Sequence, residues 1–138
     1  MSKNLSKKPY KFDAIIIGAG IVGLAIAESL IKDYDNILVV EKEDTFGRHI
    51  SSRNSEVIHS GFYYKTGGLK ARLCVEGNRL MYKFCRKYGI NHKNCGKMII
   101  SHTDSDHKRL EKLLKNGKNN GVKGMRIISG NEAQQKEP

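Results

Sequence analysis

The chain has 138 residues, of which 38% are hydrophobic, and this length has room for about one domain of a soluble fold. Its 25 Lys and Arg residues outnumber its 14 Asp and Glu residues, so the net charge is +11 at pH 7. Such an excess can indicate a nucleic-acid or acidic-membrane partner. The cations are scattered rather than interleaved with aromatic residues, so we expect no nucleic-acid partner. A basic tail, solvated helix faces or an absent acidic remainder would also explain the charge.

The start of the chain and its cysteines bear on location. Residues 1–11 are polar and lysine-rich and are predicted to form a disordered basic tail. The apolar run that follows is too short to span a bilayer and carries a glycine motif, which argues against a signal peptide. The spacing of Cys74, Cys85 and Cys95 fits neither a zinc site nor a disulfide framework. We therefore predict a cytoplasmic protein with no metal site, and peripheral contact with the inner face of a membrane is compatible with it.

A βαβ pattern near the start of the chain is its most informative feature. Residues 14–17 and 37–40 are short, β-branched apolar runs, which suit strands buried in a parallel sheet, and an alanine-rich helix pattern lies between them. Three glycines follow the first strand and have separate tasks in a dinucleotide site. These tasks are a tight turn at Gly18, room for a pyrophosphate at Gly20 and close packing of helix on sheet at Gly23. Free N–H groups at the helix start would hold the phosphates.

Glu41 ends the second strand pattern. At this position a carboxylate can accept hydrogen bonds from both hydroxyls of a ribose, and it disfavours the 2′-phosphate of NADP. A glycine motif alone is weak support, but here the two strands, the helix and the terminal acid all agree with it. The predicted fold class is therefore α/β, with an N-terminal, Rossmann-like βαβ unit that binds a dinucleotide.

The segment 49–64 concentrates hydroxyls, an amide, two histidines and an arginine, without helical or strand periodicity. Polar density beside a nucleotide site favours a loop that wraps phosphate, a ribityl chain or a ring. An ordinary surface loop is the alternative.

Later elements follow from periodicity. Apolar residues at three- and four-residue steps predict an amphipathic helix over 69–88, closed by Gly89, with its apolar positions in a core. Gly77 in its middle lowers the stability of the helix by roughly 1 kcal/mol relative to alanine, a cost that would be tolerated if something packs closely there. Two further strands are expected, at 97–101 and 125–128. A third helix is expected to be capped by Asp104 or Ser105 and to end before a turn-rich break at 116–121.

The predicted strands and helices are too few for a complete doubly wound domain. Parallel strands are buried on both faces, yet the sequence offers two obvious parallel strands and few helices to cover them. We therefore interpret the chain as the first part of something longer, and we expect the isolated chain to be poorly soluble.

Three stretches carry a resemblance to a known family. The runs 47–64, 68–79 and 95–100 resemble the FAD-dependent L-2-hydroxyglutarate dehydrogenases and oxidases, which belong to the D-amino-acid-oxidase-like flavoproteins. The resemblance covers residues 12–138, and members of that family are several times longer. It implies an FAD-binding segment at 12–92 and, at 93–138, the truncated beginning of a mixed α+β substrate domain, whose antiparallel sheet would open at residues 95–101.

The resemblance also implies site residues. Those near the FAD pyrophosphate, ribose and ribityl chain would be Gly18, Gly20, Ile21, Val22, Gly23, Glu41, Lys42, Arg48, His49, Ser51, Ser52, Asn54 and Ser55. His59 would lie near the isoalloxazine ring. We expect it to act as the catalytic base or as a flavin contact, since neutral imidazole accepts a proton near pH 7. A histidine merely hydrogen-bonded in a packed loop is the alternative. Arg53 would pair with a substrate carboxylate or with a phosphate.

The implied reaction is oxidation of a small-molecule 2-hydroxy acid, namely L-2-hydroxyglutarate to 2-oxoglutarate, with hydride transfer to flavin. We expect the chain to be inactive alone unless a C-terminal companion chain completes it. Two other functions remain open at this point: a fragment of an NAD-binding dehydrogenase, and a non-enzymatic truncated product or interaction module.

Overall fold

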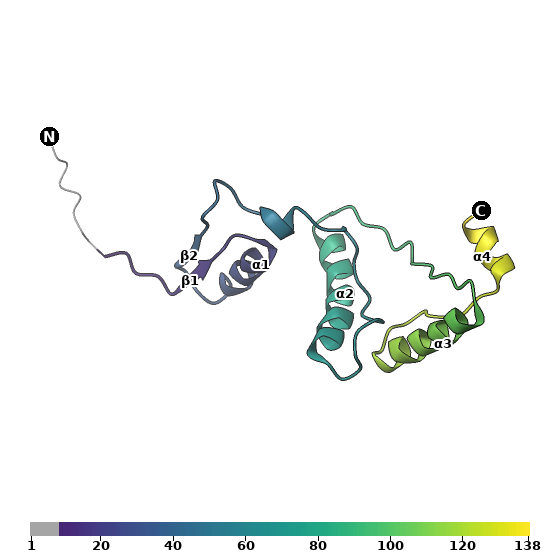
Figure 1. Cartoon of the computed structure of the whole chain (residues 1–138). Helices are drawn as coiled ribbons and strands as arrows, with labels where there is room; N and C mark the ends of the chain where they lie inside the picture. Colours follow the sequence, from purple (N-terminus) through teal and green to yellow (C-terminus); the bar gives the residue numbers. More distant parts are fainter. Residues whose placement is uncertain (1–8) are drawn as a thin grey trace. The chain divides into compact units, whose positions relative to one another are not determined.

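The structure is a computed structural model that describes residues 9–138 (Figure 1). Residues 1–8, which make up most of the predicted tail, lie outside the described residues. The chain divides after Glu56 into two compact units, and the second unit is Val57–Pro138. None of the described helices is long and apolar enough to cross a membrane.

The first unit is the predicted βαβ pattern. Strands β1 (Ala14–Ile17) and β2 (Ile37–Val40) pair in parallel, and helix α1 (Ile21–Leu30) connects them. Ala14 lies opposite Ile37, and the ladder continues at its far end where Gly18 N–H donates to the Val40 carbonyl at 2.7 Å. The predicted α/β class and both strand ranges are confirmed.

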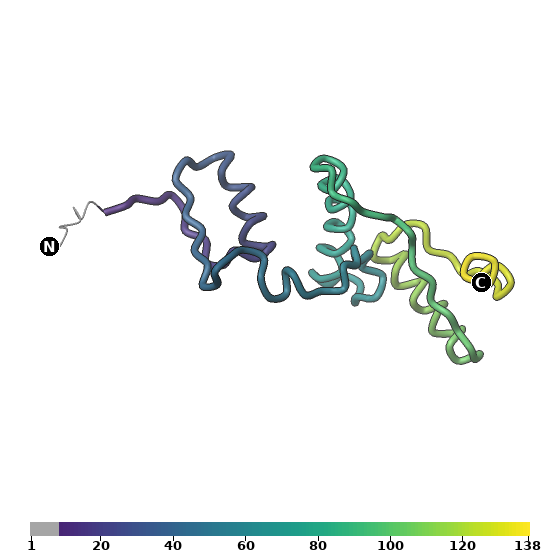
Figure 2. The backbone as a smooth tube through the Cα atoms, turned by 90° about the horizontal axis from the view of Figure 1, so that it is seen from above, coloured from purple at the N-terminus to yellow at the C-terminus, as the bar shows by residue number. Residues whose placement is uncertain are grey.

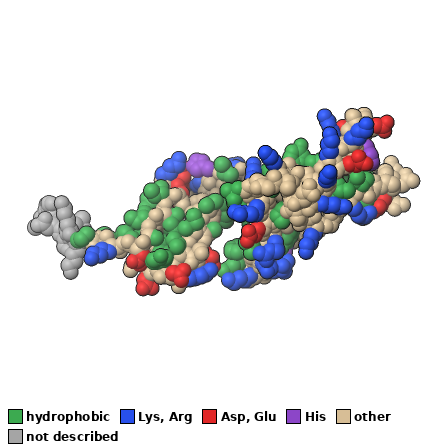
Figure 3. All heavy atoms as spheres, turned by 90° about the horizontal axis from the view of Figure 1, so that it is seen from below, with side chains coloured by type: hydrophobic (Ala, Val, Ile, Leu, Met, Phe, Trp, Pro, Cys, Tyr) green, Lys and Arg blue, Asp and Glu red, His purple; other side chains and the backbone are tan. Residues whose placement is uncertain are grey.

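Helix α1 covers one face of this two-stranded sheet. Ile16, whose side chain points to that face, is only 9% exposed, and a Cβ on Gly23 would lie 2.0 Å from the Gly18 carbonyl oxygen. The other face is bare, because Ile15 is 58% and Ile17 90% exposed. Figure 3 shows hydrophobic side chains gathered on the surface of this part of the chain, beside the grey tail. The unit therefore has a packed helix side and an open apolar side.

The second unit contains three helices: α2 (Leu69–Lys87), α3 (Asp104–Asn119) and α4 (Gly130–Lys136). Helix α2 ends as predicted, since Gly89 adopts φ +64° and Ile90 N–H returns to the Cys85 carbonyl at 2.9 Å. The expected core along α2 is wrong, because Ala71 and Cys85 are its buried residues whereas its large apolar side chains are about half exposed.

The two further strands predicted at 97–101 and 125–128 are wrong. Both segments run without regular secondary structure, and Figure 2 shows the first of them as part of a long stretch between α2 and α3. β1 and β2 are the strands of the described residues, and they pair with each other. A β-branched run becomes a strand only where a neighbouring strand completes its backbone hydrogen bonds, and these two segments have none.

Helix α3 differs from its prediction at both ends. Its cap is Thr103, whose hydroxyl accepts a hydrogen bond from Asp106 N–H at 3.2 Å, rather than Asp104 or Ser105. The break expected from residue 116 is also misplaced, since the helix continues to Asn119. Tertiary contacts explain why the helix continues past residue 116. The Asn116 side chain donates hydrogen bonds to the carbonyls of Phe62 and Tyr64, in the segment that precedes α2.

Candidate functional site

The turn between β1 and α1 forms the first part of the site. Gly18 adopts φ +104°, a conformation that L side chains rarely adopt, and this turns the chain off the strand. Gly20 caps α1 without a side-chain hydrogen bond, and no acidic residue lies in the first turn of the helix. The positive end of the helix dipole is therefore free of a competing carboxylate on its own first turn.

Ser51 lies against this turn, although it is far away in the sequence. Its hydroxyl oxygen accepts a hydrogen bond from Ile21 N–H at 3.0 Å, and a Cβ on Gly20 would lie 3.1 Å from the same oxygen. Gly47 N–H also donates to the Ala19 carbonyl at 2.9 Å, which holds the start of the Ser51 loop to the glycine turn. One side-chain and one backbone hydrogen bond thus place a serine hydroxyl at the start of α1.

Glu41 closes the other side of the turn. Its Oε2 accepts a hydrogen bond from Ala19 N–H at 2.7 Å, and its Oε1 accepts from the N–H groups of Lys42 and Glu43 at 2.8 and 3.1 Å. The hydrogen bond from Ala19 is the main reason why the pKa of Glu41 lies below its usual value of 4.5. The carboxylate is therefore ionised at neutral pH and fixed beside the glycine turn.

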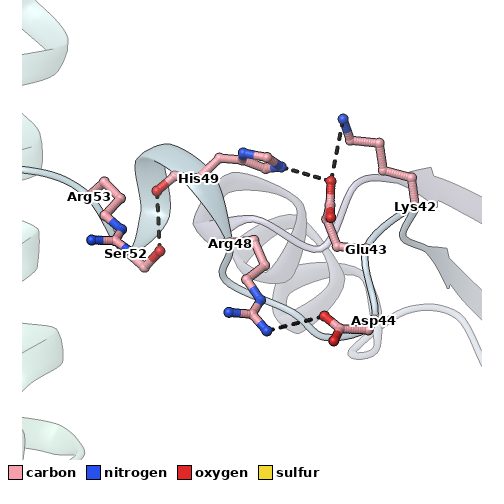
Figure 4. Close-up of a pocket in the computed structure, with 7 residues that line it drawn as sticks. All are labelled: Lys42, Glu43, Asp44, Arg48, His49, Ser52 and Arg53. Carbon is pink, nitrogen blue, oxygen red and sulfur yellow. Dashed lines mark hydrogen bonds and ion pairs between the residues drawn. The ribbon is translucent and has the colours of Figure 1, made fainter.

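A charged cavity of about 500 Å³ lies next to Glu41 (Figure 4). It is lined by Lys42, Glu43, Asp44, Arg48, His49, Ser52 and Arg53. Two of its cations and one histidine face acids. Arg48 pairs with Asp44 at 3.2 Å, while His49 and Lys42 both approach Glu43, at 2.8 and 3.5 Å. The hydrogen bond from His49 is the first cause of the lowered pKa of Glu43. Arg53 makes no ion pair with any residue that the structure describes.

The predicted cofactor residues thus fall into three groups. The glycines, Ile21, Val22, Glu41 and Ser51 converge on the turn, whereas Lys42, Arg48, His49 and Ser52 line the neighbouring cavity. The side-chain amide of Asn54 donates hydrogen bonds to the backbone carbonyls of Ile50 and Ser51 at 3.2 and 3.3 Å. Asn54 and Ser55 do not line the cavity. Sequence reasoning missed Glu43 and Asp44, although the four-residue spacing of Asp44 and Arg48 could have signalled that ion pair.

The turn fits the diphosphate of FAD. Gly20 carries no side chain at the turn, and the helix start carries positive polarity. Ser51 adds a hydroxyl whose hydrogen is free to donate, because its oxygen accepts from Ile21. Glu41 keeps lone pairs for ribose hydroxyls beyond its three backbone contacts, since a carboxylate has about four acceptor positions.

His59 belongs to the second unit and lines a different cavity. This cavity has a volume of about 240 Å³ and is formed by His59, Ser60, Gly61, Phe62, Tyr63, Tyr64 and Lys97. Six of these seven residues are consecutive, so one loop, residues 59–64, makes most of the wall. Lys97 comes from the extended segment between α2 and α3.

One asparagine of α2, one of α3 and the C-cap residue of α3 hold the 59–64 loop. Asn116 donates to the carbonyls of Phe62 and Tyr64 at 2.6 and 2.8 Å, and Asn120 donates to those of Gly61 and Tyr64 at 3.0 and 2.8 Å. From α2, Asn78 donates to the His59 carbonyl at 3.1 Å. Sequence reasoning missed these three residues, which we call the asparagine clamp. The four-residue spacing of Asn116 and Asn120 on one helix face was the available signal.

The fold and the first-unit site together define a dinucleotide-binding protein of the βαβ class. A family model described as FAD dependent oxidoreductase, abbreviated DAO, matches residues 13–138, and the chain belongs to this family. FAD is accordingly the cofactor of the family, as predicted, and the resemblance to D-amino-acid-oxidase-like flavoproteins is confirmed.

Individual relatives within the family show which enzymes the chain is similar to. The chain is 46% identical over 129 residues to "L-2-hydroxyglutarate dehydrogenase, mitochondrial" of Bos taurus, which covers 92% of the chain and 28% of the relative. It is 45% identical to the protein of that name from Pongo abelii, covering 92% of the chain and 31% of the relative. It is 38% identical to "L-2-hydroxyglutarate dehydrogenase" of Escherichia coli (strain K12), and the match covers 92% of the chain and 30% of the relative. The chain therefore spans somewhat under a third of the length of these relatives.

The relatives' names correct one prediction. The expected cytoplasmic location is wrong, because the relatives from Pongo abelii, Bos taurus and Homo sapiens are all named mitochondrial. The inference from unpaired cysteines failed because reduced thiols are compatible with more than one compartment.

Proposed function

We propose that this chain is the N-terminal, FAD-binding part of an enzyme that oxidises L-2-hydroxyglutarate to 2-oxoglutarate. The observation that carries the proposal is the convergence of Gly20, Ser51 and Glu41 on the start of α1, in a chain whose relatives are named for that substrate. We place the FAD-binding segment at 12–92 and the beginning of the substrate domain at 93–138.

The residues of the turn bind and orient the cofactor. The N–H groups at the start of α1 and the Ser51 hydroxyl would hold the diphosphate, while Glu41 would accept from the adenosine ribose. Lys42 and Arg48 would add positive charge along the diphosphate or ribityl chain, with His49, Ser52, Asn54 and Ser55 beside them. When bound, FAD supplies the acceptor for the hydride that leaves C2 of the 2-hydroxy acid.

We propose His59 as the group that accepts the hydroxyl proton of the substrate. Support comes from the loop that carries it, because Asn78 fixes the His59 carbonyl while the residue itself lines a cavity. In an active enzyme that contains this chain, His59→Ala should lower turnover with FAD still bound. Unchanged turnover would remove His59 from the mechanism.

Two alternatives retain a physical basis. An NAD-binding dehydrogenase fragment would use the same βαβ unit, but the family description favours FAD. An interaction module is supported by the bare sheet face at Ile15 and Ile17. A C-terminal companion chain that covers this face would reconcile the exposed surface with enzymatic activity, and we include such a companion, together with peripheral membrane contact, in the proposal.

The test is the visible absorption spectrum of the purified chain after incubation with FAD and removal of free cofactor. We expect a retained flavin band that is lost in Gly20→Val, because a larger side chain would displace Ser51 from the helix start. Gly77→Val is a control in the second unit, since φ is not positive at Gly77 and nothing lies within 4 Å of an added Cβ. A band retained equally by all three proteins would contradict the proposed site.

A further inference from the structure

We propose that Lys97 is a carboxylate-binding residue, and that the cavity it shares with His59 takes the carboxylate of a small 2-hydroxy acid. The inference deepens the proposed function and rests on it for the choice of acid. The cavity, its charge and the loop that shapes it come from the second unit alone.

The charge of this cavity is unbalanced. Lys97 is its one lysine or arginine, and no acidic residue lines it. Lys97 makes no ion pair or hydrogen bond within the part of the chain that the structure describes. A second cation lies close by, because the Lys70 ammonium sits over the Tyr64 ring, 4.7 Å from its centroid. The first-unit cavity differs, since its lining includes two acids, Glu43 and Asp44, which pair with Lys42 and Arg48.

The wall of the cavity also favours an anion. Carbonyl oxygens would repel a carboxylate, but those of His59, Gly61, Phe62 and Tyr64 all accept hydrogen bonds from the asparagine clamp. These oxygens are therefore directed at α2 and α3. Hydroxyl groups of Ser60, Tyr63 and Tyr64 remain among the lining residues, and hydroxyls can donate to a carboxylate.

The size and the neighbouring groups indicate the class of ligand. A volume of about 240 Å³ suits a small organic acid rather than a nucleotide. His59 lines the same cavity as Lys97, so an acid held by the ammonium would lie in the space that the imidazole also borders. Lys97 would thus set the orientation of the substrate, whereas His59 would accept the proton.

The decisive experiment follows the amide and imidazole chemical shifts of the full chain by NMR during titration with L-2-hydroxyglutarate. We expect shifts at residues 59–64 that saturate in the native protein and in Lys97→Arg, which keeps the charge. In Lys97→Met, which keeps most of the stem, affinity should fall roughly tenfold, as for loss of a hydrogen bond to a charged group. Lys93→Met, an exposed lysine on the same segment, is the matched control and should bind normally.

The outcomes separate this inference from the proposed function. Native-like affinity in Lys97→Met, or no shift at residues 59–64 in the native protein, would overturn the carboxylate site even if the chain retains FAD. Binding that depends on Lys97 in a chain that does not retain FAD would support the carboxylate site and count against the proposed FAD function. The uncharged dimethyl ester of the same acid should produce no saturating shift, and equal binding of the ester would also overturn the inference.

Discussion

The hydroxyl oxygen of Ser51 lies 3.0 Å from the backbone nitrogen of Ile21 and accepts its hydrogen bond. This contact joins residues 30 positions apart and places a hydroxyl at the first turn of α1. The helix start would otherwise offer that N–H group to solvent or to an anion. Ser51 therefore satisfies the helix start in the free chain and brings its own hydroxyl hydrogen to the place proposed for a phosphate.

Ser51→Ala should weaken FAD binding roughly three- to tenfold, as expected for loss of one hydrogen bond. The measurement is a titration of the chain with FAD, followed by flavin fluorescence. Ser101→Ala, in the second unit, is the control and should leave the affinity unchanged. If Ser51→Ala binds FAD as tightly as the native chain, the hydroxyl is a helix cap and not a phosphate ligand.

Gly23 and Gly77 give a matched pair of helix-interior glycines with opposite expected effects. A Cβ at Gly23 would meet the backbone oxygen of Gly18 at 2.0 Å, whereas nothing lies within 4 Å of one at Gly77. Gly23→Ala should lower the free energy of unfolding of its unit by about 1–3 kcal/mol through overpacking. Gly77→Ala should raise it by up to about 1 kcal/mol through helix propensity. Urea unfolding followed by circular dichroism measures both, and destabilisation by Gly77→Ala would indicate a close contact at that position.

Asn116 donates two hydrogen bonds into the 59–64 loop. Asn116→Ala leaves the Phe62 carbonyl without this partner and should cost about 1–3 kcal/mol in unfolding free energy. Hydrogen exchange at residues 61–64 should accelerate as well. Asn119→Ala, on the exposed side of the same helix, is the control, with an expected change within about 0.5 kcal/mol. Equal effects of the two substitutions would show that the clamp does not stabilise the loop.

The lowered pKa of Glu41 predicts a specific pH dependence. Because the pKa of the folded state lies below the usual 4.5, ionised Glu41 stabilises the fold above that pH, and this contribution is lost as the pH falls through the lowered pKa. Glu41→Gln should therefore have a lower melting temperature than the native chain at neutral pH, and the difference should shrink on acidification. Comparing the two proteins cancels the contributions of Glu43, Asp106 and Glu132, whose pKa values are also lowered. A difference that is constant with pH would contradict the role of the charge.

Local patterns predicted the first unit well, because its elements are defined by short-range signals. The β-branched runs, Gly18 and Glu41 each have one favourable place in a βαβ unit, and the structure puts them there. The Ser51 contact depends on a loop that returns to the glycine turn, and sequence spacing does not encode that return. The resemblance supplied Ser51 where periodicity did not.

The second unit was predicted less well for a physical reason. The segment 97–101 has the composition of a strand, but a strand needs a hydrogen-bonded neighbour, and composition cannot tell whether one is present. The asparagine clamp was missed because Asn116 was read as a helix breaker. Its side chain instead bonds to carbonyls more than 50 positions earlier in the chain, and this tertiary contact outweighs the local preference.

The bare sheet face predicts that the isolated chain self-associates. Ile17 is 90% exposed on that face, and an uncovered parallel sheet with apolar residues is a site for association. Ile17→Lys should therefore reduce association, measured by sedimentation velocity, while leaving the circular dichroism spectrum unchanged. Ile16→Lys is the contrasting variant, because Ile16 is 9% exposed beneath α1, and a charge there should unfold the first unit. A native chain that sediments as a monomer and unfolds in one cooperative transition would show that the open face does not drive association.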